Sequence, residues 1–387
     1  MVFAMLSLAW ADSITKAVMP STTASATART VLVSVSMILT LAVFIAVQAV
    51  QVGLRASLTD GSTPTQQSRA NTWAGRHITI SGFLAYFAAY MGPTKDEAGP
   101  EGTVFARTSI VTTIYLAITV LITCLYIPDD QTTTLEIPRT QRVAGMRLIR
   151  RVLLGNSSQI RGILLVQFFS WLGWFPLLFY TVPYVKSLDQ SYQTTNTNSG
   201  ALAPLSYSAV SMLMAFIWTS RSSRDGTAFK FSASLSISDR DIWIASHCIF
   251  GWSMLGTFFI TSALGTVLLF SAVGISWAVT SRVPYSLMGD ELSRGSSEWS
   301  EDEFDDVSDH HGLVYGLHNL AICLPQILIM ALMGLVWLFT QTDDSTSGVV
   351  WFLRLGGLSA FAAAYFATKL AENQSSVGDL IEVEQQR

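Results

Sequence analysis

Three polar side chains lie on one face of an otherwise apolar segment, where their amide and guanidinium groups could hydrogen-bond to a polar partner. Gln48, Gln51 and Arg55 follow one another at helical spacing among Val, Leu, Ile, Ala and Phe. A charged group at membrane depth costs at least about 2.5 kcal/mol on insertion scales, so it normally faces a bundle interior, a watery cavity or the headgroup boundary. This stripe is therefore a candidate functional site.

A second group of candidate residues lies on the apolar stretch 161–184 and has the chemistry of a sugar site. Gln167, Trp171 and Trp174 occur at i, i+4 and i+7, and Pro176 predicts a kink beside them. Aromatic rings stack against the C–H face of a pyranose, while amides bond to its hydroxyls. The alternative is a belt of tryptophans at the membrane interface, although Trp174 lies well inside the stretch.

Further amides lie on the last apolar stretch but one. Asn319 and Gln326 fall near the face of Tyr315, and Pro325 predicts another kink. Polar side chains in such helices either contact substrate or hydrogen-bond between helices, and both interpretations stay open. His318 lies close by, but we expect it at a loop end without the carboxylate or thiolate partners of a metal site.

Charged residues close the apolar stretches at one predicted end, where they could form a gate. Residues 54–60 resemble residues 284–290, because each segment ends a stretch with Ser-Leu and then an acid. Parallel repeats of this kind are typical of transporters built from two six-helix halves. Arg282 could pair with an acid there, or could simply anchor the helix at the interface. The candidate gate residues are Asp60, Arg76, Arg282 and Asp290.

The composition is that of a membrane protein, since half of the residues are hydrophobic, only 13% are charged, and the mean hydropathy is +0.42. A soluble domain carries about 25% charged residues, so an all-α polytopic membrane helix bundle is predicted. About nine stretches are long and apolar enough to cross about 30 Å of hydrocarbon as helices. They are residues 31–54, 74–91, 109–127, 161–184, 201–218, 242–261, 264–281, 313–340 and 349–370.

Lys and Arg residues are concentrated in alternate loops, which predicts the orientation of the chain. Arginines cluster at 55–76, in the connection 128–160 and at 221–240, whereas the opposite loops hold little beyond Lys95 and Lys186. By the positive-inside rule, the first group of loops is cytosolic, and so is the C-terminal tail.

The long basic connection divides the predicted spans into unequal groups. We expect a partial N-terminal transmembrane half at 1–127, a cytosolic linker at 128–160, a six-helix half at 161–370 and a cytosolic tail at 371–387. Residues 1–10 are too short to span, and we interpret them as the tail of a helix whose beginning is absent. If the two halves are repeats, about two and a half helices are missing, through a misassigned start or a truncated or divergent product.

The sequence holds none of the common catalytic signatures: no phosphate-cradling glycine loop, nucleophile elbow or pair of catalytic carboxylates. The three cysteines lie in or beside apolar stretches without metal-ligand spacing, so they are expected to be small buried hydrophobes. We therefore expect no enzyme activity, no cofactor, no metal and no nucleic-acid partner. Any transport must be driven by a gradient.

Four segments resemble the sucrose transporter group of the major facilitator superfamily, the glycoside–cation symporters, and most of all its fungal sucrose/maltose permease branch. Residues 48–56 resemble the family's fourth helix, and residues 66–76 resemble the next cytosolic loop. Residues 167–176 resemble the seventh helix, and residues 312–326 resemble the eleventh. The resemblance implies a major facilitator fold whose first two helices are absent.

The resemblance also implies proton-coupled uptake of sucrose, maltose or a related glucoside, with a small neutral sugar and protons as partners in a lipid bilayer. Arg55 takes the place of the family's arginine for substrate and coupling. Phe44 stands where plant members have an acid, and residues 81–86 depart from the family's Gly-Asn-x-x-Gly-Tyr, so the proton-binding group is in doubt. The resemblance favours an integral multi-pass protein of the plasma membrane over one of the vacuolar membrane.

Two alternatives stay open. The missing helices favour a transport-inactive pseudo-transporter. A sugar-sensing membrane receptor could use the same sugar site, with the acidic segment 290–309, interpreted as a solvated cytosolic loop, recruiting a partner.

Overall fold

The structure is a computed structural model, and it describes residues 1–18, 26–62, 66–91, 103–126, 150, 158–188, 199–217, 238–294, 311–340 and 345–370. Most of the predicted linker 128–160, much of the acidic segment 290–309 and the whole predicted tail 371–387 lie outside these residues. Every regular element in the described part of the chain is helical, which confirms the prediction of an all-α protein.

All nine predicted stretches coincide with helices. These are α3 (Ala26–Asp60), α4 (Gln67–Tyr90), α5 (Thr103–Tyr126), α7 (Ser158–Leu188), α9 (Leu202–Ile217), α10 (Asp239–Leu255), α11 (Ala263–Thr280), α14 (His311–Thr340) and α15 (Ser345–Ala367). Within the described residues, six spans are long and apolar enough by themselves to cross a membrane. The helices α9 and α10 are shorter than these, at 16 and 17 residues, and α4 carries more polar side chains.

The chain divides into two compact units, which are described separately. Unit 1 consists of Met1–Arg55 and Gly92–Arg142, and it contains α1 (Val2–Ala9), α2 (Ala11–Val18), most of α3, and α5. In this unit α1 contacts α5. The apolar window of α3 has no buried residue, so its Val, Ile, Leu and Phe side chains present the kind of surface that lipid tails solvate.

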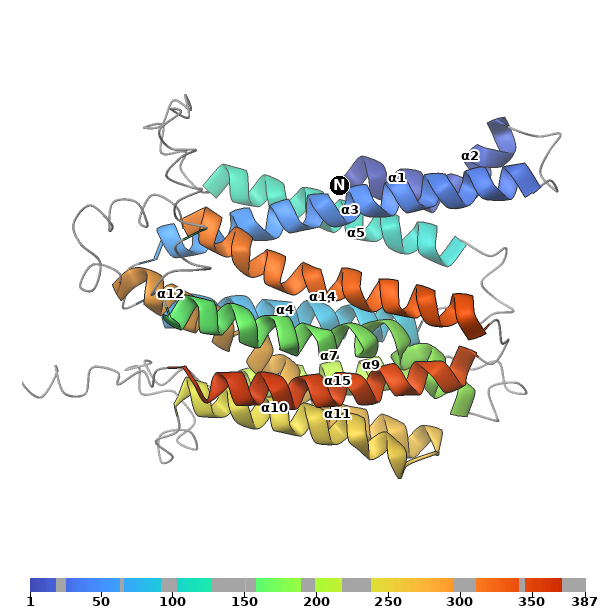
Figure 1. The fold of residues 1–387 in the computed structure, drawn as a ribbon. Coiled ribbons are helices and arrows are strands. Elements are labelled where there is room, and N and C mark those ends of the chain that lie inside the picture. Colours follow the sequence, from blue (N-terminus) through green and yellow to red (C-terminus); the bar gives the residue numbers. More distant parts are fainter. Residues whose placement is uncertain are drawn as a thin grey trace, which may run out of the picture. The chain divides into compact units, whose positions relative to one another are not determined.

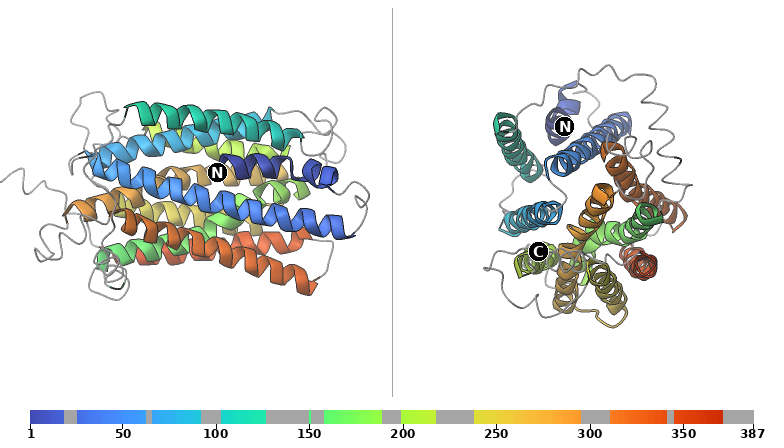
Figure 2. Two further views of the ribbon diagram at one scale, coloured as in Figure 1. Left: turned by 90° about the horizontal axis from the view of Figure 1, so that it is seen from above. Right: turned by 90° about the vertical axis from the view of Figure 1, so that its left-hand side faces the viewer.

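Unit 2 consists of Ala56–Met91 and Val143–Arg387, and its helices run side by side along one common direction (Figure 1, Figure 2). It contains α4, α7, α9, α10, α11, α12 (Val283–Arg294), α14 and α15. The helix α7 packs against α15 and α14, while α9 packs against α11 and α4, and α10 against α15 and α11. The predicted domain boundaries stay a prediction, although α4 groups here with the C-terminal helices.

Helices of unit 2 approach closely where glycines face each other. A Cβ on Gly173 of α7 would lie 2.7 Å from the carbonyl oxygen of Gly356 on α15, and one on Gly356 would lie 3.1 Å from Gly173 Cα. Gly274 of α11 packs in the same way against the backbone of Tyr207 on α9. Small residues allow backbones in a membrane to come close enough for extensive van der Waals contact. These crossings therefore hold α7 and α15, and α9 and α11, in fixed register.

Arg354 ties α15 to the C-terminal end of α10. Its Nη2 donates to the Thr257 carbonyl oxygen at 3.1 Å, and its guanidinium carbon lies 3.8 Å from the ring centroid of Phe258. Thr257 and Phe258 belong to the short helix η3 (Gly256–Phe258), which ends α10. An arginine at a helix C-terminus satisfies carbonyl groups that have no partner within the helix. Arg354 lies within the predicted apolar stretch 349–370, and these contacts at the end of α10 supply its partners.

Candidate functional site

Gln167 of α7 is buried and hydrogen-bonded across the bundle. Its Nε2 lies 2.8 Å from Nε2 of His318 on α14, and both residues are at most 1% exposed. Which of the two side chains donates this hydrogen bond depends on the tautomer of His318. His318 was expected at a loop end, which is wrong, because it lies two turns inside α14 and contacts a candidate substrate residue.

Three polar atoms on α7 are buried without a hydrogen-bond partner among the described residues. They are Gln167 Oε1, Ser170 Oγ and Trp171 Nε1, and they follow one another at i, i+3 and i+4. Leaving a buried polar group unsatisfied costs about 1–3 kcal/mol, so native structures keep few of them. Together with Trp174 these residues form the α7 stripe, whose polar atoms suit a hydroxyl-rich ligand or ordered water.

The two tryptophans of the α7 stripe have different surroundings. The Trp174 side chain is 1% exposed, and its ring centroid lies 4.6 Å from Phe250 of α10 and 4.9 Å from Trp277 of α11. Trp171 is half-buried, and its ring lies 6.2 Å from Trp277. In this conformation Trp174 is therefore part of the aromatic core, and Trp171 is the ring with surface to offer to a ligand.

The candidate residues of α14 lie on both sides of Pro325, which is inside the helix as predicted. Asn319 is 7% exposed, and Gln326 is half-buried. The ring of Tyr285 on α12 lies 4.9 Å from that of His318. The sequence did not single out His318 and Trp277 for the substrate site. The helical spacing of His318 from Tyr315, and the position of Trp277 deep in an apolar span, could have indicated them.

Gln48, Gln51 and Arg55 all lie on α3 in unit 1, so their stripe is described by itself. Gln48 and Arg55 are half-buried, whereas Gln51 is exposed. Their role in binding and coupling stays a prediction.

The predicted gate residues are placed differently from one another. Arg282 is 7% exposed, and its Nη2 donates to Asp239 Oδ1 at 3.1 Å. Asp239 comes from the first turn of α10, and the pairing of Arg282 with an acid that follows it in the sequence stays a prediction. Asp290 is half-buried on α12, and the side chain of Asp60 lies outside the described residues.

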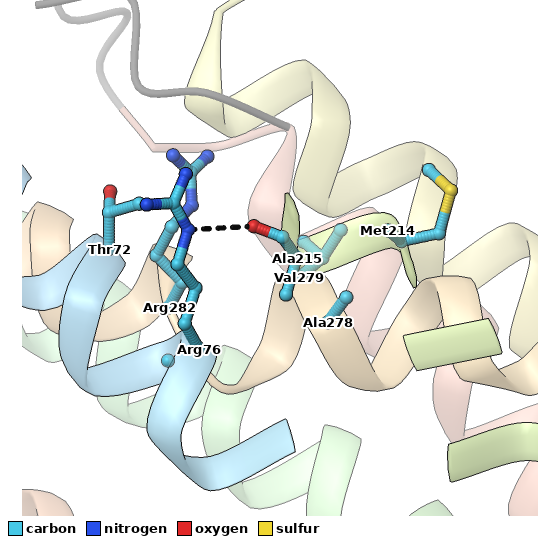
Figure 3. A pocket seen from close by; sticks show the side chains of 8 residues that line it. Thr72, Arg76, Met214, Ala215, Ala278, Val279 and Arg282 are labelled. Atoms are coloured by element: carbon cyan, nitrogen blue, oxygen red, sulfur yellow. Dashed lines mark hydrogen bonds between the residues drawn. The ribbon is translucent and has the colours of Figure 1, made fainter. Parts of the chain in front are cut away.

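Arg76 and Arg282 line the same small pocket of unit 2 (Figure 3). Arg76 Nε donates to the carbonyl oxygen of Ala215, in the last turn of α9, at 3.1 Å. This pocket is distinct from the α7 stripe, because none of its lining residues belongs to α7.

Uncharged groups join the end of α3 to α4 and α14. The Thr59 and Tyr315 hydroxyls lie 2.8 Å apart, and Gln67 Nε2 donates to the Thr59 carbonyl oxygen at 2.7 Å. A Cβ at Gly289 would lie 3.3 Å from Gln67 Oε1, so α12 also packs closely here. The sequence did not predict these contacts, because hydropathy does not indicate which polar groups meet.

Comparison with known proteins decides the family. No protein-family model matches the chain. Over 198 residues, half of this chain, it is 41% identical to the MFS-type transporter cctQ of Talaromyces islandicus, and the match covers 78% of that protein. The chain belongs to the major facilitator superfamily. It is also 25% identical over 403 residues to the general alpha-glucoside permease of Schizosaccharomyces pombe, with 83% of this chain and 70% of that protein covered.

Membership of the major facilitator superfamily and the apolar helices make the chain an integral multi-pass membrane protein. Both relatives are named as a transporter or a permease, which agrees with the prediction that the chain is not an enzyme. The predicted polytopic fold is confirmed.

Proposed function

We propose that this protein is a secondary active transporter that carries sucrose, maltose or a related neutral glucoside by alternating access, coupled to protons. The observation that carries the proposal is the α7 stripe. Three buried atoms, Gln167 Oε1, Ser170 Oγ and Trp171 Nε1, have no hydrogen-bond partner in the described chain. The rest of the Trp171 ring is partly exposed. A pyranose supplies both hydroxyl donors and acceptors for such atoms and a C–H face for the ring.

The charge of the α7 stripe supports a neutral substrate. Its members are an amide, a hydroxyl and two indoles, none of which is a charged side chain. An acidic or basic substrate would require an opposite charge in the site, because an unpaired buried charge is costly. The similarity to an alpha-glucoside permease supports the same class of substrate.

The remaining parts of the proposal follow the sequence. Arg55, with Gln48 and Gln51, serves substrate binding and coupling. Asp60, Arg76, Arg282 and Asp290 form the cytosolic gate, Asn319 and Gln326 line the substrate path, and the protein works in the plasma membrane with its C-terminus in the cytosol. Phe44 stands where plant members of the family have an acid, so the proposal assigns no proton-binding group there. His318 is a titratable side chain in direct contact with Gln167.

Uptake by a Gln167 variant tests the proposal. Cells that express the protein should accumulate labelled maltose or sucrose, and Gln167→Ala should raise the half-saturating concentration about ten- to a hundredfold by removing a buried hydrogen-bonding group. Gln159→Ala, at the start of the same helix, is the matched control and should leave uptake unchanged. Surface expression is measured for both variants.

Two outcomes would reject transport of this class. Equal half-saturating sugar concentrations for wild type and Gln167→Ala would show that the α7 stripe does not bind the substrate. Sugar binding to the purified protein without any uptake would identify a receptor instead of a transporter.

A further inference from the structure

Two arginines from different helices share one small pocket in unit 2, which we call the two-arginine pocket. Arg76 comes from α4 and Arg282 from the turn between α11 and α12, and the rest of the wall is formed by Thr72, Gly75, Met214, Ala215, Ala278 and Val279 (Figure 3). The charge of Arg282 is close enough to act on the Arg76 guanidinium. Like charges repel, so the folded chain holds this pair at an electrostatic cost.

Only part of that charge is neutralised within the described residues. Arg282 forms an ion pair with Asp239, whose side chain is 32% exposed. Arg76 makes no ion pair among the described residues, and the hydrogen bond of its side chain there runs from Nε to the Ala215 carbonyl oxygen. The terminal Nη groups of Arg76, which are the fork that binds oxyanions, are therefore not engaged by the described chain.

The Arg76 guanidinium is held in position in advance of any ligand. Its central carbon lies 4.7 Å from the ring centroid of Trp73 and 5.4 Å from that of Phe216. The stacked rings and the bond to Ala215 fix the plane of the guanidinium, and a fixed fork loses little entropy on binding.

The backbone brings the two arginines together at a glycine. A Cβ added to Gly75 would lie 3.3 Å from Arg282 Cβ and 3.7 Å from the Ser281 carbonyl oxygen. A larger side chain at Gly75 would therefore separate α4 from the end of α11. The buried Thr72, one turn earlier on α4, adds a hydroxyl to the same wall.

We propose that the two-arginine pocket is a binding site for a phosphate-type oxyanion, independent of the transported substrate. The Arg76 fork faces a cavity to whose wall Arg282 adds a second positive charge. A tetrahedral oxyanion can accept two parallel, charge-assisted hydrogen bonds from such a fork. The pocket lies at the predicted cytosolic end of the helices, so the oxyanion is either a free anion of the cytosol or a lipid headgroup phosphate.

The experiment uses the purified full-length protein and two probes. Its melting temperature is measured against inorganic phosphate at constant ionic strength, and retention of dioleoyl phosphatidic acid over dioleoyl phosphatidylcholine is measured by native mass spectrometry. Wild type should show a saturable response to at least one probe. Arg76→Gln should weaken that response about tenfold or more, because it removes a charge-assisted fork. Arg69→Gln, an exposed arginine on the same helix, is the matched control.

A second pair of variants does not depend on removing an arginine. Met214→Glu places a carboxylate on the pocket wall, where it should occupy Arg76 and abolish binding of both probes without loss of folded protein. Met214→Gln has nearly the same shape without the charge and should bind as wild type does.

The outcomes distinguish a free anion from a lipid headgroup phosphate, and they can overturn the proposal. A response to phosphate alone assigns the pocket to a soluble anion, and retention of phosphatidic acid alone assigns it to a lipid headgroup. No response to either probe in wild type, or equal binding by Met214→Glu and Met214→Gln, would reject the site.

Discussion

At the scale of single residues, helical spacing predicted which side chains share a face but not what that face meets. Gln167, Trp171 and Trp174 do share α7, yet one ring is half-exposed and the other is sealed against Phe250 and Trp277. The partners of Trp174 come from α10 and α11, and no local pattern indicates them. The same holds for Arg282, whose carboxylate partner Asp239 lies 43 residues earlier in the chain.

Substitution of the two tryptophans should separate ligand binding from packing. Trp171→Ala should raise the half-saturating sugar concentration about ten- to a hundredfold with surface expression retained, because it removes about 1.5–3 kcal/mol of ring burial against the sugar. Trp174→Ala should instead lower the amount of folded protein, since a truncated buried aromatic costs about 3–5 kcal/mol. Uptake kinetics and surface labelling measure both, and Trp171→Phe should recover most of the loss. The reverse pattern would make Trp174 the sugar platform.

At the scale of elements, hydropathy predicted every long helix of the residues that the structure describes, because a span needs only enough apolar residues to cross the membrane. It did not predict how the helices pair. The crossing of α7 with α15 depends on Gly173 and Gly356. A hydropathy profile does not distinguish these residues, but their lack of a side chain lets the two backbones approach closely. The start of α4 and the end of α3 are joined by Gln67 and Thr59, which a hydropathy profile treats as loop residues.

Alanine at Gly173 should weaken the crossing of α7 with α15. Its Cβ would lie 2.7 Å from the Gly356 carbonyl oxygen and 3.0 Å from Phe250, so the helices must move apart. Overpacking of this kind costs about 1–3 kcal/mol, and the melting temperature in detergent should fall by several degrees. Gly334→Ala on α14 is the control, because a Cβ there meets nothing within 4 Å. An equal melting temperature for Gly173→Ala and Gly334→Ala would show that the crossing tolerates separation.

At the scale of the whole molecule, the sequence predicted the class of protein and the relatives showed the superfamily. The unequal distribution of Lys and Arg between the loops predicts which end of each helix is cytosolic. Arginine-rich loops resist translocation, whereas apolar helices can insert in either direction. The loops that carry this signal lie mostly outside the described residues. Orientation also decides whether the two-arginine pocket faces the cytosolic leaflet.

Accessibility of single cysteines should establish that orientation. In a variant without Cys124, Cys248 and Cys323, a thiol reagent that cannot cross the membrane is applied to intact cells. Cysteines introduced at Ser157 and Ser297, in the arginine-rich connection and the acidic segment, should stay unlabelled until the cells are opened. A cysteine at Ser191, in the connection between α7 and α9, should react at once.

The three positions together make the test decisive, because they lie in loops that the positive-inside rule assigns to opposite sides. Labelling at Ser157 and Ser297 with protection at Ser191 would show that the orientation is opposite to the predicted one. The two-arginine pocket would then lie on the outer face. A lipid headgroup of the cytosolic leaflet would then be excluded as its ligand, while a soluble oxyanion would not.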